Sequence, residues 1–159
     1  MIRKAIESFI HQINTQNVEG ICSLMTDDHI FIDNIGSKFE GKAMMREGWK
    51  GYFSMFPDYK ITVTQIMGSG NDALLCGIAE GTYQNCKEKE AHFKVPAAWK
   101  AIVENGKIKL WQVFADTKVQ FDVIEKYKWN YISSITNVNI SGCPYIEFSL
   151  NLFEKSKVK

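Results

Sequence analysis

The fold is decided by one stretch of the sequence, residues 92–116, HFKVPAAWKAIVENGKIKLWQVFAD. It contains two extended runs rich in Val, Ile and aromatic residues, separated by Asn105-Gly106. An Asn-Gly pair between two such runs is typical of a tight turn between antiparallel strands. The stretch therefore predicts a β-hairpin with strands at 92–104 and 107–116. The first strand is longer than the usual length of about 5 to 6 residues and contains Pro96, which indicates a bent strand in a curved sheet.

Two further extended runs precede this hairpin, at 59–67 and 73–83. The segment between them, 68–72, reads GSGND and is typical of a turn. Gly77 and Gly81 lie inside the second run, where glycine commonly marks a bend or a bulge. The four runs together predict a curved antiparallel meander.

The N-terminal part of the chain has helical periodicity. Apolar residues recur every three or four positions over 2–14, 18–25 and 44–56, which predicts three amphipathic helices. A short β-branched and aromatic run at 29–33 predicts a brief strand between the second and third helices. Pro57 ends the third helix because proline disfavours helical backbone at the residue before it.

The composition indicates a soluble globular protein. Lys and Arg total 19 against 18 acidic residues, so there is no positive excess to bind nucleic acid or an anionic membrane surface. No hydrophobic stretch has the length of a signal peptide or a membrane span. The 4 cysteines and 3 histidines are scattered without ligand spacing, so we expect no metal site, reduced thiols and a cytoplasmic location.

The length of 159 residues fits one domain, which we place at 1–128, followed by a C-terminal extension at 129–159. Residues 117–127 predict a helix that closes the domain. The extension contains the apolar run 145–150, YIEFSL. Its role stays open between a strand added at a subunit edge, a flap over a pocket and a terminal helix.

Four motifs occur in order over residues 5–127. They are a segment from Phe9 to Gly41 that includes Ile32-Asp33-Asn34-Ile35-Gly36, the junction Phe56-Pro57-Asp58-Tyr59, the segment Val95-Pro96-Ala97-Ala98-Trp99, and Asn105-Gly106-Lys107-Ile108 followed by Trp111-Gln112-Val113-Phe114-Ala115-Asp116. In order and spacing they resemble the nuclear transport factor 2-like superfamily, especially its SnoaL-like polyketide cyclase and ketosteroid isomerase-like branches.

This resemblance implies an α+β fold, a cystatin-like cone with three N-terminal helices packed on a strongly curved, mostly antiparallel sheet. It further implies an apolar pocket for a small apolar organic molecule, chemistry without a cofactor, and a homodimer formed through the outer face of the sheet. The same fold hosts enzymes and non-catalytic binding modules, so the activity does not follow from the fold.

Asp33 stands where ketosteroid isomerases place the aspartate that moves a proton at carbon. A carboxylate at the edge of an apolar cavity is poorly solvated, so its pKa rises and it becomes a better base. The alternative is a turn aspartate that binds the backbone of Ile35 or Gly36. The resemblance fails at the isomerase's oxyanion donors, because the matching positions are Phe9 and 97–98, which carry no donor.

Asp116 follows Trp111 in an arrangement that resembles SnoaL-like cyclases, where an aspartate from this region acts as acid and base in an aldol closure. The two residues are an odd number apart, so a regular strand would place them on opposite faces. Both can line a pocket only if the strand bulges or ends between them. A capping role for Asp116, with bonds to the amides of Lys118 or Val119, is the alternative to catalysis.

His92 and Glu80 are the other titratable candidates in the predicted sheet. His92 could act as an acid-base group near neutral pH, paired with Glu80 or Tyr83. Glu80 is a second carboxylate if it points inward and a solvated sheet residue if it points outward. A surface position is the alternative for both.

The candidate pocket wall is aromatic and consists of Trp49, Tyr52, Phe53, Phe56, Trp99 and Trp111. Some of these side chains must fill the core instead of a cavity. We expect a small-molecule-binding protein, a cofactor-independent cyclase or isomerase of a small polyketide- or steroid-like carbonyl compound that uses Asp33 and Asp116. The alternative is a non-catalytic ligand-binding or dimerisation module of the same fold.

Overall fold

The computed structural model describes residues 2–134, and within them six strands form one curved sheet in the order β2-β1-β6-β5-β4-β3. The strands are β1 (Met25–Ile32), β2 (Lys38–Glu40), β3 (Lys60–Ser69), β4 (Asp72–Thr82), β5 (His92–Glu104) and β6 (Lys107–Ala115). The helices are α1 (Ile2–Asn14), α2 (Val18–Ser23), α3 (Lys42–Met55) and α4 (Thr117–Ser134), with short 3-10 turns η1 (Tyr83–Asn85) and η2 (Lys89–Ala91) between β4 and β5.

The predicted meander is present, because β3, β4, β5 and β6 pair antiparallel in chain order. β1 pairs parallel with β6 and antiparallel with the short β2. The sheet is therefore mostly antiparallel, and the predicted α+β fold is confirmed.

The predicted bend in the sheet lies at Gly77. The pairing of β3 with β4 shifts between Val63 and Gln65, which is a bulge next to this glycine. A Cβ atom at Gly77 would clash with the carbonyl oxygen of Thr62. Only glycine lets the two strands approach this closely where the sheet curves.

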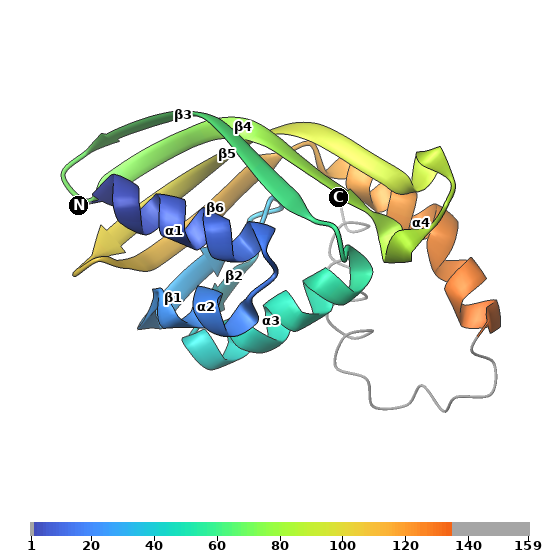
Figure 1. Cartoon of the computed structure of the whole chain (residues 1–159), viewed down its shortest axis with the longest axis horizontal. Helices are drawn as coiled ribbons and strands as arrows, with labels where there is room; N and C mark the ends of the chain where they lie inside the picture. Colours follow the sequence, from blue (N-terminus) through green and yellow to red (C-terminus); the bar gives the residue numbers. More distant parts are fainter. Residues whose placement is uncertain (1, 135–159) are drawn as a thin grey trace.

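The three N-terminal helices lie under the concave side of the sheet, and α4 lies at its far end (Figure 1). The apolar stripe of α1 is buried as its spacing predicts, with Ile6, Phe9 and Ile13 fully enclosed. Burial of each such side chain contributes about 1.5–3 kcal/mol. The side chain of Asn14 then fixes the end of α1 to edge strand β3, because it bonds both the N–H and the carbonyl of Ile61, at 2.8 and 2.9 Å.

The predicted second helix is wrong at its C-terminal end. The sequence predicts a helix over 18–25, whereas α2 ends at Ser23 and Met25 begins β1. The cause is pairing with β6: the N–H of Ile108 donates to the carbonyl of Leu24 at 2.7 Å. The chain therefore joins the sheet earlier than the predicted strand 29–33.

Two other boundaries differ from the prediction. β2 was not predicted, since three residues carry too little pattern to be read as a strand. β3 continues through Ser69, within the predicted turn 68–72, because Ser69 pairs with Asp72. The turn therefore consists of Gly70 and Asn71. Gly70 has a φ of 60°, which glycine adopts readily.

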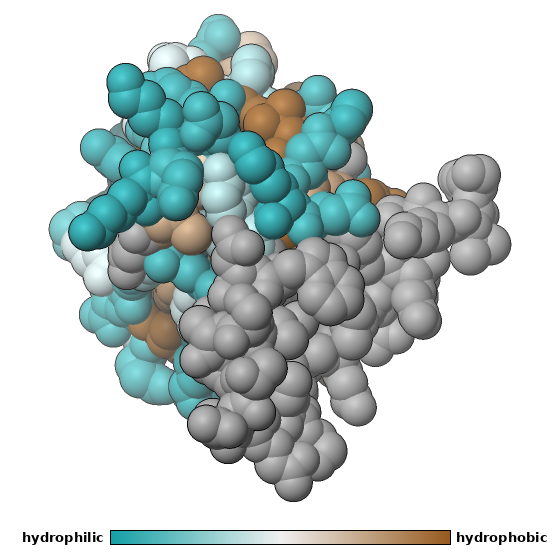
Figure 2. Space-filling model, turned by 90° about the vertical axis from the view of Figure 1, so that its right-hand side faces the viewer, coloured by the Kyte–Doolittle hydropathy of each residue, from teal (hydrophilic) through white to brown (hydrophobic). Residues whose placement is uncertain are grey.

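The predicted closing helix is α4, which runs beyond residue 127 to Ser134. It therefore crosses the predicted boundary between 128 and 129, and the rest of the predicted extension, 135–159, lies outside the described residues. Among the described helices, none is long and apolar enough to span a membrane. Where Figure 2 colours the residues at the end of the molecule that carries α4, it shows mainly hydrophilic side chains around smaller hydrophobic patches.

Candidate functional site

An apolar pocket of about 140 Å³ lies between α3, α4 and the concave face of the sheet. Its polar lining residues include Asp33, Asn34, Asp116 and Gln120. The aromatic lining residues are Phe31, Phe39, Trp49, Tyr52, Phe56, Tyr59, Phe93, Trp99, Trp111 and Phe121. Such a cavity, with apolar walls and few polar groups, is typical of a site for a small organic molecule.

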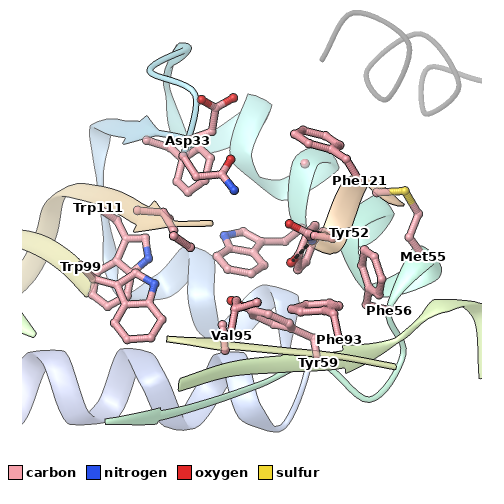
Figure 3. Close-up of a pocket in the computed structure, with 18 of the residues that line it drawn as sticks. Asp33, Tyr52, Met55, Phe56, Tyr59, Phe93, Val95, Trp99, Trp111 and Phe121 are labelled. Carbon is pink, nitrogen blue, oxygen red and sulfur yellow. Dashed lines mark hydrogen bonds between the residues drawn. The ribbon is translucent and has the colours of Figure 1, made fainter. Parts of the chain in front are cut away.

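Strand alternation builds the sheet side of this pocket. Phe93, Val95 and Trp99 of β5 all point to the concave face because they are an even number of residues apart. Trp99 stacks on Trp111 of β6 with ring centroids 6.3 Å apart. Figure 3 shows these two tryptophans side by side at one end of the pocket and Tyr52 at the other.

The helical side of the pocket comes from α3. Trp49, Tyr52 and Phe56 are three or four residues apart, so they share one face of the helix and its end. Phe53 was expected in the wall but lies outside it. Its ring packs in the core, 5.2 Å from the ring of Trp49.

Asp33 lies directly after β1 and is 7% exposed. Its Oδ1 accepts hydrogen bonds from the N–H of Ile35 at 3.0 Å and of Ser37 at 2.7 Å. Its Oδ2 is buried and has no hydrogen-bond partner within the part of the chain that the structure describes. Burial raises the pKa of this carboxyl, while the backbone N–H groups of Ser37 and Ile35 oppose the rise.

The side chain of Asp33 therefore has both features that the sequence left as alternatives. One oxygen holds the turn, and the other is a desolvated acceptor at a pocket-lining residue. Figure 3 shows the residue at one end of the pocket, with its carboxyl group on the side of the turn.

Asp116 also lines the pocket, but its side chain is exposed. β6 ends at Ala115, so Asp116 no longer follows the alternation that separates it from Trp111. Its Oδ1 accepts from the N–H of Lys118 at 2.9 Å, which is the capping bond expected at the start of α4.

Glu80 and His92, the two titratable site candidates of the predicted sheet, lie outside the pocket, at the surface position that the sequence left as the alternative. Their neighbours in sequence, Ala79 and Phe93, line the pocket, so alternation turns both side chains to the outer face. The expected pairing does occur there: His92 Nε2 lies 3.7 Å from Glu80 Oε2, and Lys94 Nζ lies 3.1 Å from the same oxygen. This cluster is a surface ion pair of the sheet.

Two pocket-lining tryptophans carry buried donors without partners. The indole nitrogens of Trp49 and Trp99 are buried and make no hydrogen bond to any residue in the described range 2–134. Buried polar groups in native proteins are nearly always satisfied. Oδ2 of Asp33 is a third buried polar atom of a pocket-lining residue that has no hydrogen-bond partner among residues 2–134.

Sequence reasoning missed Tyr59 and Gln120. Tyr59 extends the aromatic spacing of Tyr52 and Phe56, so this spacing could have identified it, but it was assigned to the start of a strand. Gln120 lies on α4 and gives no such signal. Its Nε2 donates to the hydroxyl of Tyr52 at 2.7 Å, which connects α4 to α3 across the pocket.

A sequence model of the SnoaL-like domain family matches residues 6–111. No protein of curated function shows a significant match to the sequence. The matched segment holds Asp33 and most of the aromatic wall, but not α4.

Solved structures share the fold. A ketosteroid isomerase-like protein from Catenulispora acidiphila, solved with trimethylamine, is 16% identical, with a TM-score of 0.64 over 72% of this chain and 86% of its own. TerC, co-crystallised with polyporic acid, is 16% identical, with a TM-score of 0.66 over 77% and 97% of the two chains. A putative SnoaL-like polyketide cyclase from a Jannaschia species is 14% identical, with a TM-score of 0.62 over 77% and 92%. At these identities the likeness shows the fold alone.

Proposed function

The chain belongs to the SnoaL-like domain family, and we propose that it binds a small carbonyl compound and transfers a proton on it without a cofactor, as a cyclase or an isomerase. The observation that carries this proposal is that Asp33 lines an aromatic pocket and that its Oδ2 is buried without a hydrogen-bond partner among the described residues. Two structural neighbours were solved with small molecules, trimethylamine and polyporic acid, which supports a small ligand in this fold.

The volume of the pocket limits the size of this compound. A cavity of about 150 Å³ lined by aliphatic and aromatic side chains holds one benzene molecule, and this pocket measures about 140 Å³. A compound of about one six-membered ring therefore fits, whereas a four-ring steroid does not. We propose a one-ring or short polyketide-like carbonyl compound as the substrate class.

Asp33 suits the proton transfer. Its raised pKa makes the carboxylate a stronger base than an ordinary aspartate. The carboxylate takes a proton from the carbon next to the carbonyl, and the electron pair of the C–H bond moves onto the carbonyl to give an enolate. The enolate either takes the proton back at another carbon, which is isomerisation, or attacks a second carbonyl of the molecule, whose oxygen then takes the proton, which is aldol closure.

Asp116 is the weaker candidate for catalysis. Its carboxyl already caps α4 and is exposed to solvent. We propose one catalytic carboxylate, Asp33, in place of the expected pair.

A non-catalytic binding or dimerisation module is the second candidate, and one observation favours it. The outer face of the sheet carries an apolar patch of Met67, Leu74 and Phe114, exposed by 47%, 51% and 47%, with Cys76 and Ala98 between them. We call this the outer patch. It supports a homodimer through the outer sheet face, compatible with either function. A cytoplasmic location also stays a prediction.

The proposal is tested with cyclohexanone, a one-ring ketone, in deuterated water. Exchange of the hydrogens next to its carbonyl, followed by proton NMR, reports proton removal at carbon directly. We expect the protein to accelerate this exchange and Asp33→Asn to reduce the acceleration about a hundredfold or more. Asn keeps the oxygen that accepts from Ser37, so the turn is retained.

Asp122→Asn is the matched control, because Asp122 is an exposed carboxylate of α4 outside the pocket lining. It should leave the exchange rate unchanged. Binding of cyclohexanone without any acceleration would reject proton transfer in favour of the binding module. Absence of binding would reject both.

A further inference from the structure

We infer that the pocket also binds small organic ammonium ions, which are held by the negative charge of Asp33 and by the faces of the surrounding aromatic rings. Such an ion is a quaternary amine with short alkyl groups. The inference goes beyond the proposed function, because it requires no proton transfer and names a charged class of ligand that the proposed function does not include.

The charged residues that line the pocket all have the same sign. Among the residues that the structure describes, the lining includes the carboxyl groups of Asp33 and Asp116 and no Lys, Arg or His. An anionic ligand would therefore lie beside like charges without a cation to pair with. A positively charged ligand is attracted to the same site.

Basic side chains that are close to the lining in sequence are turned away from it and paired. Lys94 lies between two lining residues of β5, and its Nζ is 3.1 Å from Oε2 of Glu80 on the outer face of the sheet. Arg46, on α3, donates to both carboxylate oxygens of Glu19, at 2.9 and 3.1 Å. These positive charges are therefore used outside the pocket.

Asp33 supplies the counter-charge for an ammonium ion. It is 7% exposed, and its Oδ2 is buried with no hydrogen-bond partner in the described chain. A buried carboxylate without compensation is energetically costly, and a nearby cation reduces this cost. The Coulomb attraction falls off gradually with distance, so it does not require the ion to touch one particular oxygen atom.

Aromatic rings border the pocket on both of its sides. Trp49 and Tyr52 come from α3, whereas Trp99 and Trp111 come from the sheet (Figure 3). The ring planes of Trp49 and Tyr52 are 90° apart and those of Tyr52 and Tyr59 are 89° apart, so the ring faces point in several directions. A cation is attracted to the face of an aromatic ring within about 6 Å of its centroid, most strongly to Trp. A tetrahedral ion can therefore be attracted to several rings at once.

The size and polarity of the pocket select among ammonium ions. A cavity of about 150 Å³ holds one benzene molecule, and tetramethylammonium has fewer non-hydrogen atoms than benzene, so it fits the 140 Å³ pocket. A primary ammonium or a guanidinium group carries several N–H groups, each of which needs an acceptor when it is buried. A quaternary ion has no N–H group, which suits a mainly apolar wall.

The test compares tetramethylammonium with tert-butanol, a neutral molecule of similar size and tetrahedral shape. The dissociation constants of both compounds for the full chain are measured by NMR titration at pH 7 and constant ionic strength. We expect tetramethylammonium to bind about tenfold or more tightly than tert-butanol, because only the cation gains the attraction to the rings and to the carboxylate.

Two substitutions separate the charge from the rings. Asp33→Asn removes the charge and keeps the oxygen that accepts from Ser37, so it should weaken tetramethylammonium binding about tenfold and leave tert-butanol binding nearly unchanged. Phe93→Leu keeps an apolar side chain in the wall but removes a ring. It should weaken tetramethylammonium binding about threefold relative to tert-butanol binding.

The matched controls are Asp122→Asn and Phe114→Leu. Asp122 is an exposed carboxylate of α4, Phe114 is 47% exposed on the sheet, and neither lines the pocket. Both variants should bind the two compounds as the unmodified protein does. A preference for tetramethylammonium that disappears in either control would overturn the inference, because the ion would then bind outside the pocket.

Equal affinity of the unmodified protein for the two compounds would also overturn the inference. So would a preference that stays unchanged in Asp33→Asn or in Phe93→Leu, because the carboxylate or the rings would then contribute nothing. None of these outcomes depends on the exchange of cyclohexanone. The inference can therefore fail while the proposed function stands, and the proposed function can fail while tetramethylammonium still binds.

Discussion

The carboxyl group of Asp33 accepts a hydrogen bond from the N–H of Ser37 at 2.7 Å, while its second oxygen is buried without a partner among the residues that the structure describes. The first bond fixes the turn after β1 and so fixes where the carboxyl stands. The second oxygen loses its solvation and gains nothing in return, which disfavours the charged form. One residue thus holds the backbone and keeps a desolvated oxygen in place.

This arrangement predicts a pH-dependent stability. The folded-state pKa of Asp33 is raised above its usual value of 3.8. The contribution of the Asp33 carboxyl to the free energy of unfolding is therefore fully present below pH 3.8. This contribution is lost as the pH rises through the folded-state pKa. Asp33→Asn removes the charge and keeps the turn acceptor, so it should increase the free energy of unfolding at pH 7 but not at pH 3. Urea unfolding at the two pH values measures this.

Asp33→Ala separates the two roles of the residue. It removes the charge and also the acceptor for Ser37, so we expect it to be less stable than Asp33→Asn at every pH by about 1 kcal/mol. Equal stability of the two variants would mean that the turn bond contributes nothing.

The sequence predicted the sheet well because its pattern is strong where the chain is long and alternating. The Asn105-Gly106 turn and the strands on either side are as expected. The end of α2 could not be predicted, because Met25 continues a helical spacing and only its pairing with Ile108 draws it into β1. Tertiary pairing overrode local periodicity there.

The site was predicted less completely for two physical reasons. Trp99 and Trp111 line the pocket, and strand parity fixes the face on which each lies. The alternation of side chains along β4 also places Glu80 on the face away from the pocket, but this follows only once the face towards the pocket is known. The small side chain of Ala79 gave no sign in the sequence that Ala79 lies on that face. Gln120 depends on how α4 docks, which no local pattern encodes.

The environment of His29 leads us to expect that the folded protein loses stability in mild acid. It is fully buried, and its Nδ1–H donates to the carbonyl of Ile108 at 2.8 Å. Its Nε2 has no hydrogen-bond partner in the described part of the chain. Burial lowers its pKa below the usual 6.5. The contribution of His29 to the free energy of unfolding is present above pH 6.5. It is lost as the pH falls through the lowered folded-state pKa of this residue. Urea unfolding should therefore give a smaller free energy of unfolding at pH 5 than at pH 7.5.

His29→Asn keeps a donor near the position of Nδ1 and cannot take up a proton in this range. It should flatten the pH dependence between pH 7.5 and 5, at the cost of a smaller free energy of unfolding overall. His11→Asn is the control, because His11 is exposed on α1. If His29→Asn keeps the full pH dependence, another group is responsible.

Because Asp116 caps α4, we expect its substitution by Ala and by Asn to affect the free energy of unfolding differently. Asn caps a helix about as well as Asp, whereas Ala does not, so Asp116→Ala should lower the free energy of unfolding by about 1 kcal/mol and Asp116→Asn should leave it nearly unchanged. Thermal unfolding measures both. Cyclohexanone exchange should persist in Asp116→Asn, and its loss there would return Asp116 to the catalytic role expected from the sequence.

If the outer patch is the dimer interface, a single glutamate introduced there should dissociate the dimer. Leu74 and Phe114 are each about half exposed on neighbouring parts of the same sheet face. A glutamate in a tightly packed apolar interface would be buried without a partner, which costs several kcal/mol. Leu74→Glu and Phe114→Glu should therefore convert a dimer to a monomer in sedimentation experiments, with little change in the fold.

Met44→Glu is the matched control, because Met44 is 53% exposed but lies on α3, away from the outer patch. A monomer before any substitution, or a dimer that survives Leu74→Glu and Phe114→Glu combined, would show that the outer patch is not the interface.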